Sequence, residues 1–259
     1  MAPWHSLEGK RVWVTGGAGY LGSAIVRELD RAGARTLCID LPGKAEALVN
    51  QHGLKNTVPV SCDLTQVAQL PGFVTQSAAA HGVPDGVVHL AFASSAGRTL
   101  EQLTAAEFQH TFAAALTPAF VLGRAVAECM KPRGSGSVVF FASMYGVVAP
   151  DPAIYAPPLT PNPIDYGASK AAVLQLARYF AVHYGSSGIR FNCVTPGPFP
   201  NPGVQQANPK FIGELERKTA LRRVGQNHEI VGPALFLLTD SASFVTGHSL
   251  AVDGGWTAW

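Results

Sequence analysis

Short apolar runs alternate with longer amphipathic stretches along nearly the whole chain. The runs are rich in β-branched and aromatic residues and are bounded by Gly, Pro or Asp, which is typical of buried strands. The predicted strands are Arg11–Thr15, Arg35–Asp40, Thr57–Asp63, Gly86–Ala91, Ser137–Ser143, Ile189–Val194 and Ser249–Val252. The clearest predicted helices between them are Leu21–Ala32, Ala105–Met130, Tyr166–Tyr184 and His228–Thr239.

This repetition of strand, helix and strand predicts the fold class. Parallel strands need crossover connections, and right-handed crossovers place helices on both faces of the sheet. Neither an internal repeat nor a linker interrupts the alternation. We therefore expect a single α/β domain over residues 1–259, with a doubly wound parallel sheet of the Rossmann type.

Two proline-rich segments depart from the alternation. Residues 150–163 contain six prolines and residues 196–209 contain five. Proline lacks an N–H and fixes φ, so we expect neither segment to form a helix or a strand ladder. Both follow predicted strands, whose carboxyl ends border the ligand crevice in open α/β sheets. We expect loops 144–165 and 196–220 to line a substrate pocket; stiff surface connections are the alternative.

Composition and charge exclude several classes of protein. The 259 residues, 47% of them hydrophobic, suffice for one large core, and a net charge of +2 is too balanced for a nucleic-acid-binding protein. Without a run of about 18 apolar residues or a leader-like start, we expect neither a membrane span nor a secretory signal. Cys38, Cys62, Cys129 and Cys193 form no CxxC pair, which favours free thiols and the cytoplasm.

A glycine-rich run, TGGAGYLG, joins the first predicted strand to the first predicted helix. Glycines permit a tight turn and leave helix N-terminal N–H groups free to bind an anion, with the helix dipole adding partial positive charge. An ordinary turn is the alternative, but the position after the first strand favours dinucleotide binding. The residues expected to contact the cofactor here are Gly16, Gly19, Tyr20, Leu21 and Gly22.

Two acidic residues end the next two predicted strands. Asp40 lies 24 residues after Gly16, where a carboxylate can accept hydrogen bonds from an adenosine ribose and repel a 2′-phosphate. NAD is therefore favoured over NADP, although Asp40 could instead cap the segment that follows. Asp63 is interpreted as an adenine contact, with an N-cap as the alternative. Leu41 and Leu64 follow these carboxylates and are included in the predicted cofactor site.

The predicted reacting group is a tyrosine. Tyr166 and Lys170 lie at i and i+4 on one face of a predicted helix. A cation about 5 Å from a phenol, at an effective dielectric constant of about 20, would lower its pKa by about two units. Tyr166 could then exchange a proton with an alcohol or a carbonyl. Ser143 ends the fifth strand, where its hydroxyl can face the crevice, and it lacks the G-x-S-x-G context of a hydrolase nucleophile.

The remaining titratable residues give weaker evidence about function. The eight histidines show no ligand spacing, so no metal site is expected, and His89 is interpreted as a core or crevice-edge residue. Arg222 and Arg223 could meet an anionic substrate, but a basic turn is the simpler interpretation.

The chain resembles the short-chain dehydrogenase/reductase family over essentially its whole length. The motifs that carry the resemblance stand in the family's order: TGGAGYLG at 15–22, Asp40, CDL at 62–64, Ser143, YGASK at 166–170, NCVTPG at 192–197 and VTGHSLAVDGG at 245–255. The resemblance implies a seven-stranded sheet and a homo-tetramer or homo-dimer. It makes Tyr166 the acid/base, Lys170 the ribose ligand that lowers the tyrosine pKa, and Ser143 the group that orients the substrate.

Further residues are assigned to the cofactor by the same resemblance. Pro196, Gly197 and Phe199 would line the nicotinamide. Ala91 and Phe92 belong to HLAF, which replaces the family's usual Asn-Asn-Ala-Gly and is, like Tyr20 in the glycine run, similar to the extended branch of the family.

Two more features depart from the family pattern. Ala115 aligns with the asparagine that normally relays protons to the lysine. Ser143 and Tyr166 are 23 residues apart, about ten more than is typical, and the proline-rich loop supplies the excess. Tyr145 and Tyr155 lie near enough in the sequence to contribute a hydroxyl to the pocket.

These observations favour an NAD-dependent oxidoreductase that interconverts a secondary alcohol and a ketone. Similarity of YGVVAP at 145–150 to sugar-acting members favours a sugar-like small-molecule substrate. The first alternative is an NAD-binding scaffold or sensor with impaired catalysis, for which Ala115 is the best support. A weaker alternative is an epimerase or dehydratase with tightly held NAD.

Overall fold

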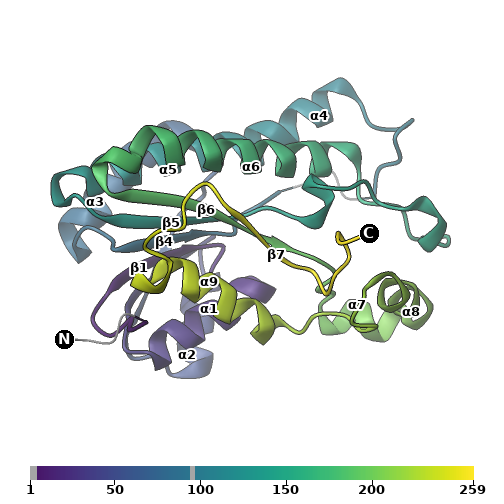
Figure 1. Cartoon of the computed structure of the whole chain (residues 1–259), viewed down its shortest axis with the longest axis horizontal. Helices are drawn as coiled ribbons and strands as arrows, with labels where there is room; N and C mark the ends of the chain where they lie inside the picture. Colours follow the sequence, from purple (N-terminus) through teal and green to yellow (C-terminus); the bar gives the residue numbers. More distant parts are fainter. Residues whose placement is uncertain (1–4, 94–96) are drawn as a thin grey trace.

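The computed structural model describes residues 5–93 and 97–259. Within these residues, seven strands form one parallel sheet in the order β3-β2-β1-β4-β5-β6-β7 (Figure 1). The strands are β1 (Arg11–Thr15), β2 (Arg35–Asp40), β3 (Thr57–Ser61), β4 (Gly86–His89), β5 (Gly136–Phe141), β6 (Ile189–Pro196) and β7 (Ser249–Val252). The predicted doubly wound, seven-stranded sheet is confirmed. The order reverses between β1 and β4, where such sheets bind ligands.

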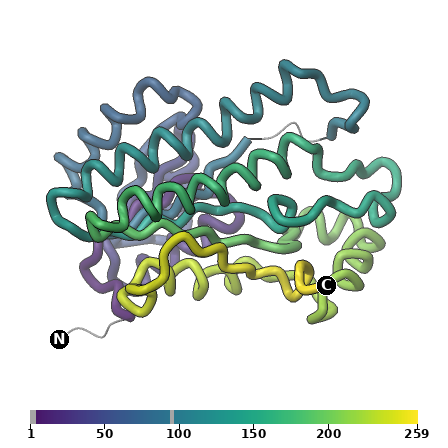
Figure 2. Tube along the Cα trace, turned by 45° about the horizontal axis from the view of Figure 1, so that its top comes forward, coloured from purple at the N-terminus to yellow at the C-terminus, as the bar shows by residue number. Residues whose placement is uncertain are grey.

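Helices cover both faces of the sheet, as Figures 1 and 2 show. The helices are α1 (Tyr20–Arg31), α2 (Lys44–His52), α3 (Leu70–His81), α4 (Ala105–Thr111), α5 (Thr117–Met130), α6 (Ile164–Tyr184), α7 (Pro202–Ala207), α8 (Pro209–Lys218) and α9 (Val231–Leu238). Helices α1, α2 and α9 lie on one face, and α3 to α6 lie on the other.

Alternating strand side chains build a core on each face. On β1, Trp13 packs toward α3, α5 and α6, whereas its neighbours Val12 and Val14 pack toward α1 and α9. The same alternation places Phe140 of β5 on the first face and Phe141 on the second. Strands buried on both faces explain why the sequence shows continuous apolar runs rather than an alternating pattern.

Several predicted boundaries are wrong. The helix expected over Ala105–Met130 is interrupted by a π-helical turn at Phe112–Leu116. The helix expected from His228 begins with a 3-10 turn, Asn227–Ile230, before α9. By length and composition the stretch Ala105–Arg133 could cross a membrane, a test that core helices of soluble proteins also pass. Here α5 packs against the sheet and α3.

The expectation of neither helix nor ladder is also wrong for the second proline-rich segment, residues 196–209, whereas residues 150–163 contain only the 3-10 turn Pro152–Ile154. Strand β6 extends to Pro196, and α7 begins at Pro202 within the second segment. Proline is tolerated at the first helical position because that N–H has no intrahelical partner. Asn201 caps α7 by accepting a hydrogen bond from the Val204 N–H. Helix α8 follows directly and was not predicted.

Candidate active site

The glycine turn between β1 and α1 is closely packed against its own backbone. Gly16 adopts φ +67°, and a Cβ on Gly22 would lie 2.2 Å from the Gly16 carbonyl oxygen. Larger residues would therefore displace the turn. Helix α1 begins at Tyr20 and its N-cap, Gly19, makes no side-chain cap hydrogen bond. The first N–H groups of α1 are thus available to an anion, as the sequence predicted.

A cavity of about 360 Å³ opens beside this turn at the carboxyl ends of β1, β2 and β3. Its predicted lining residues are Gly16, Gly19, Asp40, Leu41, Asp63, Leu64, Ala91 and Phe92. Asp40 accepts hydrogen bonds from the N–H groups of Ala18 at 2.9 Å and Leu41 at 2.8 Å. The carboxylate is therefore held at the end of β2, against the glycine turn.

Asp63 is not the N-cap that the sequence offered as an alternative, because Gln66 holds that position before the 3-10 turn Val67–Gln69. Its side chain faces the same cavity, yet it accepts hydrogen bonds from the N–H and the hydroxyl of Thr65, at 3.0 and 2.7 Å. These bonds lower the pKa of Asp63. The carboxylate thus shapes its own turn while remaining at the cavity wall.

A second cavity of about 330 Å³ adjoins the first and shares Gly16, Gly19, Leu90 and Phe92 with it. The other predicted residues that line it are Tyr20, Leu21, Gly22, Ser143, Tyr166, Lys170, Pro196, Gly197 and Phe199. Every predicted catalytic and cofactor-binding residue therefore lines one of the two adjoining cavities.

Close packing of a short turn on α6 brings Ser143 to Tyr166. Ser143 caps the 3-10 turn Met144–Gly146 by accepting a hydrogen bond from the Tyr145 N–H at 3.2 Å. A Cβ on Gly146 would lie 2.8 Å from the main chain of α6, so only glycine permits this approach. Tyr166 lies in the first turn of α6, and Lys170 follows one turn later.

Burial dominates the titration of Tyr166 and Lys170. Desolvation raises the pKa of Tyr166, and a hydrogen bond with Ser143 opposes the rise. The predicted lowering of the Tyr166 pKa by Lys170 is therefore wrong for the protein alone, because desolvation of the phenol is the largest influence on this pKa and the lysine charge is not among its causes. The Lys170 Nζ lies 5.9 Å from the Tyr166 ring centre. Burial also lowers the pKa of Lys170 to about 8. Its ammonium donates a hydrogen bond to the Phe141 carbonyl oxygen at 2.8 Å.

Comparisons with known proteins identify the family. A family model described as enoyl-(acyl carrier protein) reductase matches residues 17–257. The curated 2,5-dichloro-2,5-cyclohexadiene-1,4-diol dehydrogenase of Sphingobium indicum is 34% identical over 257 residues, covering 97% of this chain and 98% of that protein. The solved short chain dehydrogenase from Leptospira borgpetersenii, with bound NAD+, matches with a TM-score of 0.86 at 27% identity, over 99% of this chain and 96% of that one. The chain is a short-chain dehydrogenase/reductase.

Two further matches show the breadth of the family. The cis-4-hydroxycyclohexanecarboxylate dehydrogenase of Sinomonas cyclohexanicum is 30% identical over 247 residues, with 95% of each chain covered. The solved gluconate 5-dehydrogenase from Burkholderia cenocepacia, in complex with NADP and tartrate, matches with a TM-score of 0.85 at 26% identity and 98% coverage of each chain. The present short-chain dehydrogenase/reductase is accordingly an oxidoreductase that acts on CH–OH groups.

In this short-chain dehydrogenase/reductase, Phe92 does more than line a cavity. Its ring centre lies 4.3 Å from the Lys170 Nζ, and the ring meets that of Tyr166 edge-on at 4.9 Å. A cation over an aromatic face is stabilised electrostatically. Phe92 therefore packs against both Tyr166 and Lys170, contacts that sequence spacing did not reveal.

The predicted relay position carries no polar side chain. Ala115 is buried within the π-helical turn at Phe112–Leu116. A different polar link joins this region to α6: the Thr111 hydroxyl donates a hydrogen bond at 2.5 Å to Asp165, the residue before Tyr166. Asp165 is fully buried, so the link fixes the start of α6 against the end of α4.

A third hydrophobic cluster packs against Tyr166. Both predicted substrate loops, the turn after β5 and the C-terminal segment contribute to this cluster, which we call the substrate wall. Its buried members are Met144, Tyr145, Ile154, Leu215, Val224 and Trp256, with Val148, Tyr155, Tyr166, Phe211 and Ile212 packed against them. Figure 1 shows the C-terminus beside α7 and α8 at this end of the sheet.

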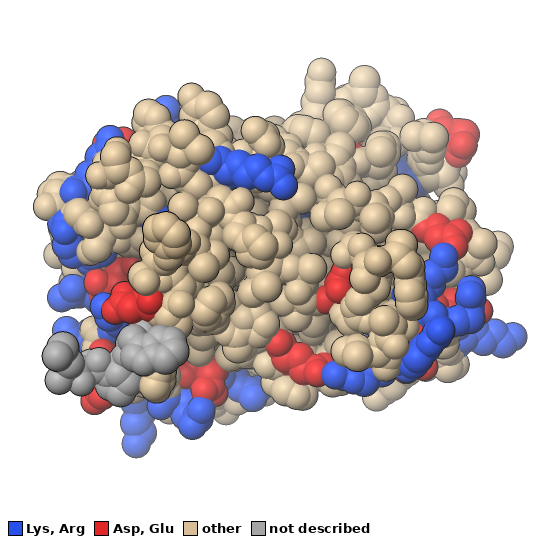
Figure 3. All heavy atoms as spheres, in the orientation of Figure 1, with Lys and Arg blue, Asp and Glu red and all other residues tan. Residues whose placement is uncertain are grey.

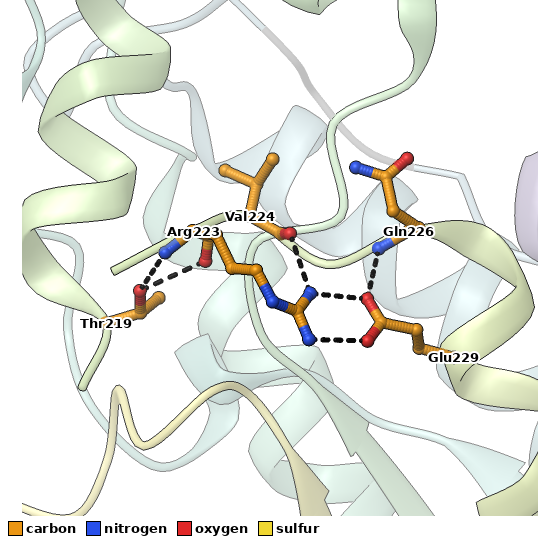
Figure 4. Close-up of polar contacts among 5 residues, drawn as sticks. All are labelled: Thr219, Arg223, Val224, Gln226 and Glu229. Atoms are coloured by element: carbon orange, nitrogen blue, oxygen red, sulfur yellow. Dashed lines mark hydrogen bonds and ion pairs between the residues drawn. The ribbon is translucent and has the colours of Figure 1, made fainter. Parts of the chain in front are cut away.

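Arg222 and Arg223 serve the fold instead of an anion. Arg223 forms two hydrogen bonds with the Glu229 carboxylate, at 2.7 and 2.6 Å, and Glu229 also accepts from the Gln226 N–H (Figure 4). The Arg222 guanidinium donates to a carbonyl of α8. The simpler interpretation, a basic turn, is confirmed. This turn supports Gly225, which packs against the Phe199 ring at the wall of the second cavity.

Two other candidate features are structural. His89 is buried and bonded to the Thr15 hydroxyl at 2.7 Å, as expected for a core histidine, and burial lowers its pKa to about 3. A cavity of about 450 Å³ lies at the amino ends of the strands, away from the predicted site. Its Arg133 and Arg190 donate to main-chain carbonyl groups.

Sequence reasoning missed several residues of the two cavities. Ala18 lies at the turn beside Asp40, Cys62 lines the first cavity, and Ala142 precedes Ser143. All three residues have small side chains, so they line the cavities mainly with their main-chain atoms. Their adjacency to predicted residues was the only available signal.

Proposed function

We propose that this enzyme interconverts a cyclic secondary alcohol and the corresponding ketone, with NAD as its cofactor. The observation that carries the proposal is the gathering of Ser143, Tyr166 and Lys170 in a cavity that adjoins the glycine turn. A nucleotide at that turn would extend along both cavities, past Asp40 at one end and toward Tyr166 at the other.

The residues present fit a nicotinamide dinucleotide. A Cβ on Gly16 would lie 2.8 Å from the main chain of Ala91, so only glycine fits at this position of the turn. The first N–H groups of α1 would bind a phosphate. NAD, when bound, supplies the hydride acceptor or donor. Lys170 would bind its ribose hydroxyls, and Pro196, Gly197 and Phe199 would line the nicotinamide.

Tyr166 would carry out the proton transfer. Its hydroxyl would take the proton of an alcohol during oxidation and return one to the carbonyl oxygen during reduction. Ser143, which already hydrogen-bonds toward Tyr166, would hold the substrate oxygen beside the phenol. Because burial raises the Tyr166 pKa, the nearby positive charge of Lys170 is needed to stabilise a phenolate.

Asp40 supports NAD as the cofactor in preference to NADP. Its carboxylate is oriented by two main-chain N–H groups toward the cavity where a ribose would lie. A 2′-phosphate at the same place would bring like charges together and would be disfavoured.

The substrate wall supports a ring as the substrate. Tyr166 packs against the aromatic and aliphatic side chains of the substrate wall, an environment that suits an apolar ring better than the sugar-like substrate predicted from sequence motifs. The relatives from Sphingobium indicum and Sinomonas cyclohexanicum are both named for reactions on six-membered rings.

The test is NADH formation with cyclohexanol and other cyclic alcohols, compared with sugars and linear alcohols. We expect turnover with the rings, and a loss of about 100-fold or more in Tyr166→Phe. Tyr184→Phe is the matched control, because its phenol bonds to Glu128 away from the site. NADH binding without any turnover would favour the scaffold. Copurified NAD without net NADH release would favour the epimerase.

We also propose that the enzyme assembles into a homo-tetramer or homo-dimer. Figure 3 shows that the face over α6, β7 and α9 is largely without charged side chains. Tyr179, Val182, Phe236 and Phe244 are large apolar residues exposed on these elements and the turn before β7. Light scattering should show a dimer or tetramer that Val182→Glu dissociates; a monomeric native protein would contradict assembly.

A cytoplasmic location is the remaining part of the proposal. It is supported by Cys38, Cys62, Cys129 and Cys193, all of which are free thiols. Fractionation of the source cells would test it, and recovery of the enzyme from an oxidising compartment would contradict it.

A further inference from the structure

A buried hydrogen bond holds the start of α6. The Thr111 hydroxyl donates to the Asp165 carboxylate at 2.5 Å, and the two residues are 2% and 0% exposed. The bond joins the end of α4 to the first turn of α6, and Figure 1 shows these two helices together above the sheet. A bond from a hydroxyl to a carboxylate at this distance is among the strong ones, and it is stronger away from water.

Close packing holds the opposite side of the same turn. A Cβ on Gly167 would lie 2.8 Å from the Tyr145 carbonyl oxygen, so the turn after β5 lies directly against α6 at this residue. Residues two apart on an α-helix are about 200° apart around its axis, so Gly167 and Asp165 face nearly opposite directions. Tyr166 stands between them, about 100° from each.

Helix α6 has no side-chain cap that could fix its start in another way. Its N-cap, Pro163, makes no side-chain cap hydrogen bond, and the loop before it contains only the 3-10 turn Pro152–Ile154. The Asp165 carboxylate lies in the first turn instead, where the helix dipole favours a negative charge. The lateral position of this turn therefore depends on the Thr111–Asp165 bond on one side and on the packing at Gly167 on the other.

Tyr166 moves with this turn. Its side chain lines the second cavity together with Ser143 and Lys170. Lys170 lies one turn later and is held separately, by its bond to the Phe141 carbonyl oxygen. A shift of the first turn would therefore displace the phenol relative to both partners. A misplacement of about 1 Å in a reacting group can cost about 100-fold in rate.

We propose that the Thr111–Asp165 hydrogen bond positions Tyr166 for proton transfer. Among the described residues that line the two cavities, neither Thr111 nor Asp165 is included, so both act through Tyr166 as positioning residues. The same bond ties the π-helical turn Phe112–Leu116 to α6, because Thr111 directly precedes that turn. This inference rests on the proposed function, since it takes Tyr166 as the group that exchanges the proton.

The first experiment uses Thr111→Val, which keeps the shape of the side chain and removes its hydroxyl. NADH formation from cyclohexanol is followed in a single turnover at saturating NAD, and the Kd of NAD is measured by fluorescence titration. We expect the single-turnover rate to fall by about ten-fold or more and the Kd to stay unchanged. Thr111→Ser keeps the hydroxyl and should keep the native rate. Thr57→Val is the matched control, because the Thr57 hydroxyl bonds to the Asp30 carboxylate at 2.8 Å and neither residue lines the two cavities.

The second experiment needs no substrate. The tyrosines are replaced by 3-fluorotyrosine, and the fluorine NMR resonance of Tyr166 is assigned by its loss in Tyr166→Phe. Thr111→Val should displace this resonance, because the phenol changes its surroundings. The resonance of Tyr184, at the other end of α6 and bonded to Glu128, should not move. Thr57→Val should leave both resonances in place.

The outcomes separate the two proposals. A Thr111→Val enzyme with the native rate, or with an unmoved Tyr166 resonance, overturns the positioning role alone. An equal fall in rate in Thr57→Val also overturns it, because that result would reflect the general loss of a Thr–Asp bond. A native protein that oxidises no ring alcohol, while Thr111→Val still displaces the Tyr166 resonance, overturns the proposed function and supports the structural link to Tyr166. Thermal unfolding of each variant verifies that it is folded.

Discussion

Replacing Lys170 with methionine is expected to make the protein more stable in the absence of cofactor while removing its activity. Lys170 is buried at the base of the active-site cavity, where its ammonium donates to the Phe141 carbonyl and lies over the rings of Phe92 and Tyr166. Methionine keeps the length and apolar stem of lysine but carries no charge. The substitution therefore removes a desolvated ion and leaves the surrounding packing nearly intact.

The size of the effect follows from the pKa of Lys170. Burial lowers this pKa from 10.5 to about 8, so the charged form costs about 3 kcal/mol of folding stability at pH 7. Methionine cannot donate to the Phe141 carbonyl, and that lost bond costs about 1 kcal/mol. We expect Lys170→Met to raise the free energy of unfolding by about 2 kcal/mol at pH 7.

The stability advantage of Lys170→Met should depend on pH. Below pH 8 the lysine is charged in both the folded and the unfolded protein, and the full cost is present. Between pH 8 and 10.5 the folded protein has lost this proton and the unfolded chain has kept it, so the native protein becomes more stable as the pH rises. The advantage of the variant should therefore shrink across this range.

Urea unfolding at pH 7 and at about pH 10, without cofactor, measures both effects. Lys210→Met, at an exposed position of α8, is the control for removing a lysine charge. A Lys170→Met variant that is less stable than the native protein at pH 7 would refute the reasoning. So would an advantage that does not change with pH.

Three further predictions concern the cofactor site. Asp40→Asn should lower the ratio of kcat/KM with NAD to that with NADP by about ten-fold, because it removes a charge that repels the 2′-phosphate; an unchanged ratio would exclude Asp40 as the selecting group. Gly22→Ala should weaken NADH binding, measured by fluorescence titration, because its Cβ would meet the Gly16 carbonyl oxygen at 2.2 Å. Normal affinity would mean that the turn can relax. Phe92→Leu removes an aromatic face worth about 0.5 to 2 kcal/mol to the Lys170 cation, so its pKa should fall further below 10.5. The basic limb of the pH–rate profile should then move to lower pH, and a shift to higher pH would contradict the cation–π contact.

Local sequence signals were sufficient for the fold and for most of the site. The glycine run acts within one strand–helix turn, and Tyr166 and Lys170 are one helical turn apart, so their spacing alone places them together. Asp40 ends a strand whose predicted boundaries are those observed. Parallel topology then brings the carboxyl ends of these strands to one edge of the sheet.

Contacts between residues that are far apart in the sequence could not be predicted from local sequence patterns. Tyr145 and Trp256 meet only because the last residues of the chain return to the turn after β5. The pKa of Tyr166 was predicted in the wrong direction, because spacing gives the lysine charge but not the desolvation of the phenol. The contact of Phe92 with Lys170 likewise depends on where β4 ends relative to α6.

The position of Trp256 in the substrate wall also bears on the order in which the enzyme is completed during synthesis. The nucleotide turn is encoded within the first strand and helix, and the acid/base pair follows from α6. Tyr145 receives its edge-on aromatic neighbour only after the ribosome has released Trp256, which follows both of these elements in the chain. A nascent chain would therefore hold the glycine turn and the Tyr166–Lys170 pair before the substrate wall is complete.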